Sequence, residues 1–124
     1  MGEVIQRETP TLHRNGVKVR HIGREAGLPR RLVDAIRGAT ALTERNERII
    51  LNVAFNYGGR AEIVDAVKRL VGDLESSGKP VSEQVTEEAI ASRLYTAGQP
   101  NPDLIIRTGG DLRISNFLIW QAAY

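Results

Sequence analysis

The sequence has 124 residues, of which 41% are hydrophobic and 26% charged, and its formal net charge is +2. This length suits one globular domain with a core of its own, and the small charge, scattered along the chain, gives no support for nucleic-acid binding. The chain has no cysteine, which excludes disulfides and thiol chemistry.

The first half of the chain alternates between helical and strand patterns. Residues 3–14 favour a helix interrupted at Pro10, and residues 17–22 alternate in the manner of a strand. Apolar residues at helical spacing follow over 29–42. Residues 48–55 are apolar at nearly every position, which is typical of a parallel strand covered on both faces.

The second half continues the same alternation. Residues 60–74 carry an apolar helical stripe, and residues 86–95 predict a second helix with Thr86 as its N-cap. We expect a third, buried strand at 104–106 and the start of another helix over 117–124. This order favours an α/β fold with a parallel β-sheet flanked by helices. Three strands make a small sheet, so we expect residues 1–124 to form a single but incomplete domain.

Two of the three expected strands end in a glycine pair. In open α/β sheets ligands bind at the carboxyl ends of the strands, so both turns are candidates for one shared site. The supporting turns of that site would be formed by Asn56, Gly58, Gly59, Arg60, Thr108, Gly109 and Gly110. A purely structural role is the more ordinary reading of the first turn.

The second turn is followed by a concentration of anion-binding side chains. Arg107, Arg113 and Ser115 lie within nine residues, and two guanidiniums with a hydroxyl suit a phosphate or diphosphate. Two purely structural roles are the alternatives. Arg107 could form an ion pair with a neighbouring aspartate, and Ser115 or Asn116 could cap the expected helix at 117. No nucleophile–base pair or metal-ligand spacing is present, so we assign no catalytic and no metal-binding residue.

The residues that carry these patterns resemble a known family. The run from Asp103 to Phe117, Asp-Leu-Ile-Ile-Arg-Thr-Gly-Gly-Asp-Leu-Arg-Ile-Ser-Asn-Phe, is similar to the signature of the cis-prenyltransferases of the undecaprenyl diphosphate synthase type. The stretches 13–23, 51–60 and 115–121 resemble further parts of the same family. The resemblance runs in order from about residue 12 to residue 124.

The resemblance implies an activity and its partners. Enzymes of this family condense isopentenyl diphosphate onto an allylic diphosphate, such as farnesyl diphosphate, with the help of Mg²⁺, and they form homodimers. By matching position, Arg107, Arg113 and Ser115 would bind the diphosphate of isopentenyl diphosphate. No apolar run approaches the roughly 18 residues of a membrane span. We therefore expect a cytoplasmic protein, with peripheral membrane contact left open.

The chain also departs from the family pattern. The family's His-x-x-Asp-Gly-Asn-x-Arg-Trp motif, which binds the allylic diphosphate and supplies an aspartate linked to Mg²⁺, is absent, and Leu112 stands where some members have a metal-assisting histidine. We therefore expect the isopentenyl diphosphate half of a synthase, inactive alone, with the main Mg²⁺ ligands missing. The alternatives are a non-catalytic partner subunit or degenerate relative of such a synthase, and an unrelated phosphate-binding α/β module.

Overall fold

The computed structural model describes residues 1–123. The chain divides into two compact units, residues 1–56 and residues 57 onward. Each unit has buried apolar side chains of its own.

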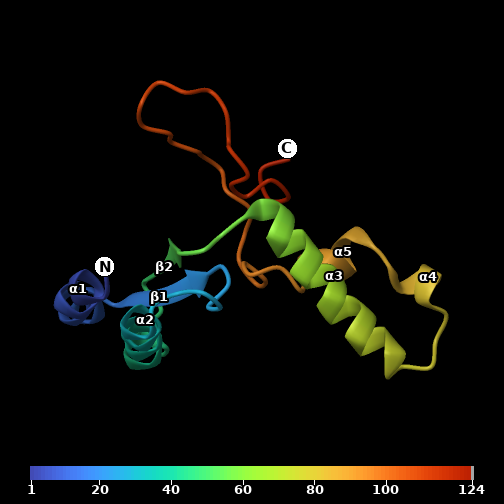
Figure 1. The fold of residues 1–124 in the computed structure, drawn as a ribbon, viewed down its shortest axis with the longest axis horizontal. Helices are drawn as coiled ribbons and strands as arrows, with labels where there is room; N and C mark the ends of the chain where they lie inside the picture. The colour runs from blue at the N-terminus through green and yellow to red at the C-terminus, as the bar shows by residue number, and fades with distance from the viewer. Residues whose placement is uncertain (124) are drawn as a thin grey trace. The chain divides into compact units, whose positions relative to one another are not determined.

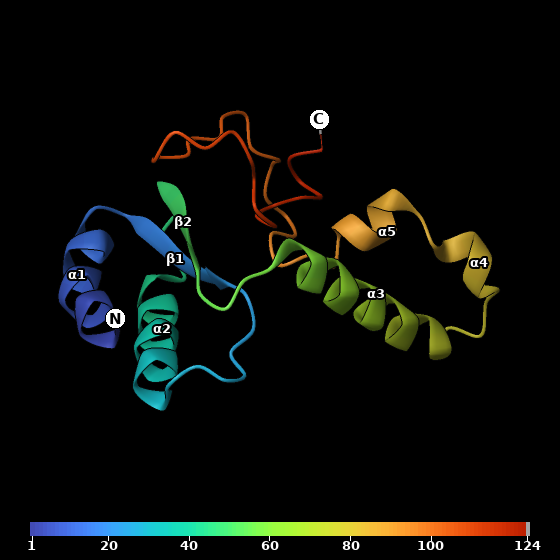
Figure 2. The same ribbon diagram turned by 45° about the horizontal axis from the view of Figure 1, so that its top comes forward.

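The first unit is a two-stranded parallel sheet with two helices. Its elements are α1 (Gly2–Arg14), β1 (Val17–Ile22), α2 (Arg30–Thr43) and β2 (Ile49–Ala54). The strands pair in parallel from Val17 opposite Ile49 to Ile22 opposite Ala54. Both helices lie on the same side of the sheet (Figures 1 and 2). The predicted parallel α/β arrangement is confirmed in this unit.

The core of this unit lies between the helices and the sheet. Its buried apolar side chains are Val19, Ile22, Leu32, Ala35, Ile36 and Ala39. A buried hydroxyl links α2 to the neighbouring strand, because Thr43 Oγ1 accepts a hydrogen bond from the Val19 N–H (2.9 Å) and donates one to the Ala39 carbonyl (2.7 Å). The helix predicted over 29–42 and the strand predicted over 17–22 are thus confirmed. The buried residues of β1, Val19 and Ile22, are three positions apart, so the burial of this strand does not follow the predicted alternation.

Two expectations for this unit are wrong. Strand β2 is not covered on both faces, because Ile49, Ile50 and Leu51 are exposed and β1 is its one hydrogen-bonded neighbour in the described sheet. Helix α1 is not interrupted at Pro10 but continues through it. Proline removes a single i→i−4 hydrogen bond from the ladder, and the rest of this 13-residue helix is retained.

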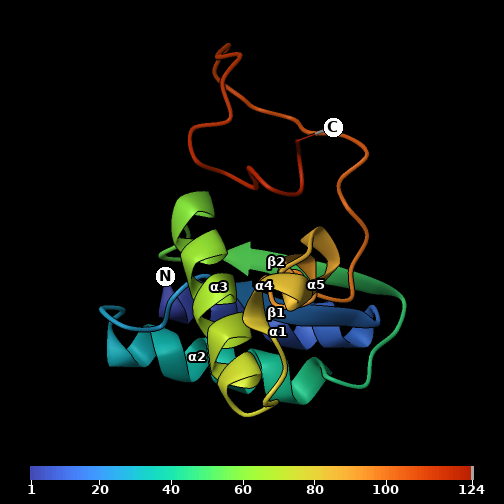
Figure 3. The same cartoon turned by 90° about the vertical axis from the view of Figure 1, so that its right-hand side faces the viewer.

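The second unit is built on one long helix. Figure 3 shows α3 (Gly59–Glu75) with the short helices α4 (Val81–Gln84) and α5 (Glu87–Ala91) beside it. Thr86 is the N-cap of α5, as predicted, and its Oγ1 accepts from the Ala89 N–H at 3.0 Å. The buried face of α3 differs from the apolar stripe of the sequence. It consists of Gly59, Glu62, Ala66, Leu70 and Leu74, whereas Val64, Val67 and Val71 are exposed.

The last part of the chain lacks the regular structure that the sequence predicts. Residues 104–106 form no strand, and all three are exposed. A strand needs a neighbour for its main-chain hydrogen bonds, and no described segment pairs with this one. Residues 117–123 form turns instead of a helix, because Asn116 and Leu118 have positive φ angles of 62° and 50° that an α-helix excludes. The predicted helix end at Tyr124 lies outside the described residues.

None of the helices in residues 1–123 combines the length and the apolar character that crossing a membrane would need.

Candidate functional site

The predicted anion-binding side chains come together around one carboxylate. Arg107 donates from Nη1 to Ser115 Oγ (2.9 Å) and to the Arg113 carbonyl (2.6 Å). Its Nη2 lies 3.4 Å from Asp111 Oδ2, and Arg113 Nη2 lies 3.5 Å from the same oxygen. The two guanidiniums and the hydroxyl thus form a cluster, here called the arginine clamp (Arg107, Arg113 and Ser115), with Asp111 between the arginines. The alternative prediction, an ion pair between Arg107 and a neighbouring aspartate, is also confirmed, because Asp111 is that partner.

The clamp lies on a long loop. Figures 1 and 3 show residues 100–117 as an extended loop that returns to the N-terminal end of α3. Its tip is the turn Thr108-Gly109-Gly110, where the glycines have φ angles of 96° and 78°. The clamp side chains are at least partly exposed, with 74% of the Arg113 side chain accessible. The guanidiniums are therefore accessible to a dissolved anion.

The turn before α3 also meets this loop, through Asn116. The Gly59 N–H donates to the Asn116 carbonyl (2.7 Å), and the Arg60 N–H donates to Asn116 Oδ1 (2.9 Å). The structure thus connects Gly59 and Arg60 with the segment that carries Ser115. Helix capping by Asn116 was predicted for a helix at 117, which does not form. The helix that Asn116 caps is α3.

Asn56 has a different position from the rest of its turn. It lies in the first unit, where its Nδ2 donates to the carbonyls of Arg24 (3.2 Å) and Ala26 (2.9 Å). It has a positive φ of 49°, a conformation that asparagine tolerates better than most residues. Its side-chain contacts fix the loop before α2.

A buried polar network, which sequence reasoning missed, holds the returning segment against α3. The carboxylate of Glu62 is 1% exposed and accepts from Tyr57 Oη (2.5 Å), the Tyr95 N–H (2.8 Å) and Gln121 Nε2 (3.0 Å). Tyr57 Oη accepts in turn from the Leu118 N–H at 3.2 Å. Burial, and then the hydrogen bond to the Glu62 carboxylate, raise the pKa of the Tyr57 phenol above its usual range.

The network could have been suspected from one signal in the sequence. Glu62 lies four residues before Ala66 and eight before Leu70, on the same helical face as these apolar positions. A charged residue at the start of a buried stripe needs partners. Those partners, at 95 and 121, are too far along the chain to be deduced from the sequence of α3.

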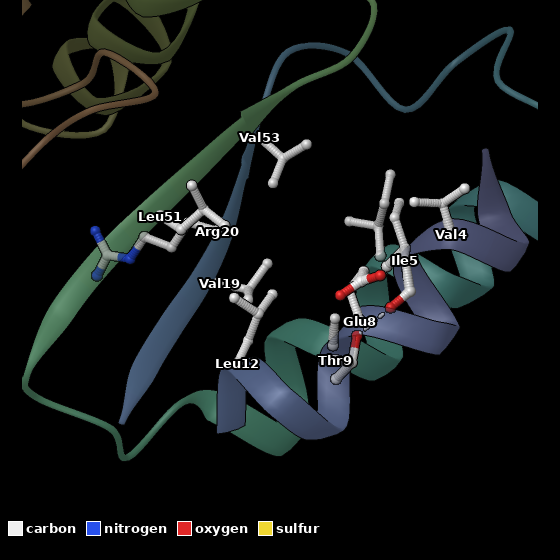
Figure 4. Close-up of a pocket in the computed structure, with 11 residues that line it drawn as sticks. Val4, Ile5, Glu8, Thr9, Leu12, Val19, Arg20, Leu51 and Val53 are labelled. Atoms are coloured by element: carbon white, nitrogen blue, oxygen red, sulfur yellow. Dashed lines mark hydrogen bonds between the residues drawn. The ribbon is translucent and has the colours of Figure 1, made fainter. Parts of the chain in front are cut away.

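The first unit contains an apolar pocket of about 150 Å³. Figure 4 shows side chains of α1 facing those of the sheet across it, while the Arg20 guanidinium points away from the helices. The apolar lining comes mainly from Val4, Ile5, Leu12, Val19, Ile36, Ala39, Leu51 and Val53. The sequence alone does not reveal this pocket, because its walls come from four separate elements.

The donor set of the described chain does not fit a metal centre. In residues 1–123 no three His, Asp or Glu side chains are grouped so that they could bind a metal ion together. Leu112, the position of the metal-assisting histidine in some members of the family, is fully exposed and offers no ligand atom. The arginine clamp itself consists of two guanidiniums and one hydroxyl.

Comparison with known proteins identifies the family to which the chain is similar. Residues 1–124 match a family model described as putative undecaprenyl diphosphate synthase. An isoprenyl transferase of Heliobacterium mobile is 48% identical over 98% of this chain and 46% of its own length. The tritrans,polycis-undecaprenyl-diphosphate synthase (geranylgeranyl-diphosphate specific) of Pyrococcus horikoshii is 49% identical over 91% of this chain and 42% of its own length.

Two solved structures share the fold. Lavandulyl diphosphate synthase from Lavandula x intermedia, in complex with dimethylallyl diphosphate, has a TM-score of 0.88 and 30% identity over 97% of this chain and 52% of that chain. A probable undecaprenyl diphosphate synthase from Campylobacter jejuni has a TM-score of 0.82 and 28% identity over 98% of this chain and 54% of that chain.

The fold and the relatives define an α/β protein of the prenyltransferase class. More narrowly, the chain belongs to the cis-prenyltransferase family, of the undecaprenyl diphosphate synthase type. The chain spans about half the length of the curated relatives that it matches.

Proposed function

We propose that this chain carries the isopentenyl diphosphate-binding half of a cis-polyprenyl diphosphate synthase. The synthase would join isopentenyl diphosphate to an allylic diphosphate such as farnesyl diphosphate, with inorganic diphosphate leaving the allylic carbon and a proton leaving the five-carbon unit. Repetition of this step yields a cis-polyprenyl diphosphate such as undecaprenyl diphosphate. Membership of the cis-prenyltransferase family supports this reaction.

The observation that carries the proposal is the convergence of the arginine clamp on Asp111. Both guanidiniums lie within 3.5 Å of the same carboxylate oxygen, and Ser115 Oγ is hydrogen-bonded to Arg107. The Asp111 carboxylate lies between the two guanidiniums, at the position that we propose for the substrate diphosphate. A diphosphate has more charge and more acceptor oxygens than one carboxylate, so it competes well for the same donors.

The apolar pocket of the first unit supports a prenylated substrate. Its lining is almost wholly apolar, and burial of each CH₂ group there is worth about 0.8 kcal/mol. Part of a growing isoprenoid chain would therefore be bound by α1, α2 and the sheet.

Mg²⁺, a homodimer and a cytoplasmic location with peripheral membrane contact are further parts of the proposal, and the family resemblance supports the first two. The grouped ligands needed for Mg²⁺ are not present in residues 1–123, so the main ligands would come from other residues of the functional synthase. The contribution of this chain is to bind and orient one diphosphate.

Calorimetric titration of the 124-residue chain with isopentenyl diphosphate tests the clamp. We expect Arg107→Gln and Arg113→Gln each to weaken binding about 10-fold or more, because a hydrogen bond to a charged group is worth about 1.5–3 kcal/mol. Lys68→Gln is the matched control, since it removes the same charge from an exposed position on α3. Equal affinity in all four proteins would show that the clamp does not bind the substrate.

Inorganic diphosphate in the same titration separates two readings of the site. A cis-prenyltransferase should bind isopentenyl diphosphate more tightly than inorganic diphosphate, because the five-carbon tail adds apolar contacts. An unrelated phosphate-binding module would bind both alike.

Elongation of farnesyl diphosphate by the chain alone, in the presence of Mg²⁺, would refute the idea that it is only half of a synthase. A gain in the elongation rate of a complete synthase on addition of this chain would favour the partner-subunit alternative.

A further inference from the structure

No residue next to the start of helix α3 in the sequence caps it with a side chain. The first N–H groups of a helix have no partner inside the helix, and the N-cap residue of α3 is Gly58, which has no side chain to supply one. The Gly59 and Arg60 N–H groups are instead bound by the carbonyl and by Oδ1 of Asn116. The cap thus comes from a residue 56 positions further along the chain.

Asn116 lies in a tightly bent segment. Ser115, Asn116 and Leu118 all have φ angles between 46° and 62°, which non-glycine residues adopt only when their surroundings hold them. Asparagine is among the residues that tolerate this conformation best. The contacts to α3 therefore both satisfy the helix and hold the bend.

The bend carries the arginine clamp. Ser115 precedes Asn116 directly, and its Oγ accepts from Arg107. Between residues 100 and 113 the described loop has no main-chain hydrogen bond to another part of the chain. Asn116 is thus the first residue after the clamp that is hydrogen-bonded to α3, and Leu118 and Gln121 make further contacts beyond it.

We propose that Asn116 is a positioning residue for the diphosphate clamp, because it fixes Ser115, and through Ser115 the Arg107 guanidinium, to the N-terminus of α3. The inference rests on the proposed function of the clamp as a diphosphate site. Asn116 does not touch the ligand in this scheme. It also occupies the Gly59 and Arg60 N–H groups, so these two amides are not available to the anion.

Three variants of the 124-residue chain separate the parts of this role. Asn116→Gly keeps the bent backbone and the main-chain carbonyl but removes Oδ1. Asn116→Asp keeps an acceptor oxygen for the Arg60 N–H and should restore the cap. Asn101→Gly is the matched control, because it gives the same freedom to an exposed position of the same loop that is distant in sequence from α3 and Ser115.

Three measurements apply to each variant. Amide hydrogen exchange of Arg60 in the free protein reports the cap, and the guanidinium NMR signal of Arg107 reports whether its contact with Ser115 is held. Titration with isopentenyl diphosphate reports the clamp. We expect Asn116→Gly to speed Arg60 exchange about 10-fold, to broaden the Arg107 signal and to weaken affinity about 5- to 20-fold. Asn116→Asp should stay within about threefold of the wild type in all three, and Asn101→Gly should change none of them.

The outcomes distinguish this inference from the proposed function. Faster Arg60 exchange in Asn116→Gly with an unchanged Arg107 signal and unchanged affinity would mean that Asn116 is only a helix cap, and would overturn the inference. If the wild type binds neither isopentenyl diphosphate nor inorganic diphosphate, the proposed function is wrong. The Arg107 signal then still decides whether Asn116 positions the guanidinium: its broadening in Asn116→Gly supports the positioning, and its retention overturns it.

Discussion

The chain has two glycine pairs, Gly58-Gly59 and Gly109-Gly110, and glycine is needed in each for a different physical reason. An added Cβ at Gly59 would lie 2.8 Å from Ile119 Cγ1 and 3.0 Å from the Asn116 carbonyl oxygen. At Gly109 and Gly110 an added Cβ would meet nothing within 4 Å, but both have positive φ angles. The first pair permits close packing of a distant segment, and the second permits a backbone bend.

The two turns also differ in their surroundings, one being packed and the other exposed. The turn before α3 belongs to a packed region in which the Glu62 carboxylate, the Tyr57 phenol and Asn116 bind the returning chain. The turn at Gly109-Gly110 lies at the tip of an exposed loop. A substitution in the first turn should thus act through stability, and one in the second mainly through ligand affinity.

Gly59→Ala should give the largest effect. The new methyl group would push Ile119 and the Asn116 carbonyl away from α3, and overpacking of this kind costs about 1–3 kcal/mol. Urea unfolding followed by circular dichroism measures the loss. Isopentenyl diphosphate affinity should fall as well, since the displaced segment leads back to Ser115. A stability equal to that of the wild type would show that the close approach is not kept in solution.

Tyr57→Phe should come next, because it breaks the network that closes the packed turn. Glu62 loses one donor and the Leu118 N–H loses its acceptor, at a cost of about 1–2 kcal/mol. The urea midpoint of the variant measures this loss.

The same residue predicts a dependence on pH. The pKa of Tyr57 is raised in the folded state, whereas an unfolded tyrosine titrates near pH 10. The stability contribution of the protonated phenol is therefore complete below about pH 10 and is lost as the pH rises further. Spectrophotometric titration of the three tyrosines should show a late component that Tyr57→Phe removes. A late component that persists in the variant would assign it to another tyrosine.

Gly110→Ala should show a smaller effect of a different kind. A left-handed conformation costs a residue with a Cβ about 1–2 kcal/mol, and an exposed loop can relax part of that strain. We expect little change in the urea midpoint and a 3- to 10-fold loss of isopentenyl diphosphate affinity, because the turn lies between Arg107 and Arg113. A large loss of stability with intact affinity would reverse the comparison between the two turns.

The sequence predicts those features of this chain that depend on near neighbours. Thr86 was identifiable as a cap because its partner amide is three residues away. The arginine clamp was identifiable because its members lie within nine residues. The strand expected at 104–106 depends on a pairing neighbour that no described residue supplies, and the sequence of a strand does not say whether its neighbour is present.

The features that the sequence did not predict depend on contacts between distant positions. Asn116 caps α3 from 56 residues away, and Glu62 is buried because Tyr95 and Gln121 reach it. The positive φ angle of Leu118, which helps to prevent the expected helix, is not favoured by leucine and comes with the hydrogen bond of its N–H to Tyr57. Tertiary contacts thus override local preference where the returning segment meets α3.

Gly72→Ala should give the smallest effect, and one of opposite sign. Gly72 lies in α3, as Gly59 does, but its φ is not in the left-handed region and an added Cβ would meet nothing within 4 Å. Alanine inside a helix is more favourable than glycine by about 0.5–1 kcal/mol, so the urea midpoint should rise while isopentenyl diphosphate affinity stays within twofold. The same chemical change in the same helix would then destabilise at position 59 and stabilise at position 72. Because helix propensity acts in the same direction at both positions, opposite signs would identify the approach of residues 116–119 as the cause of the loss at Gly59.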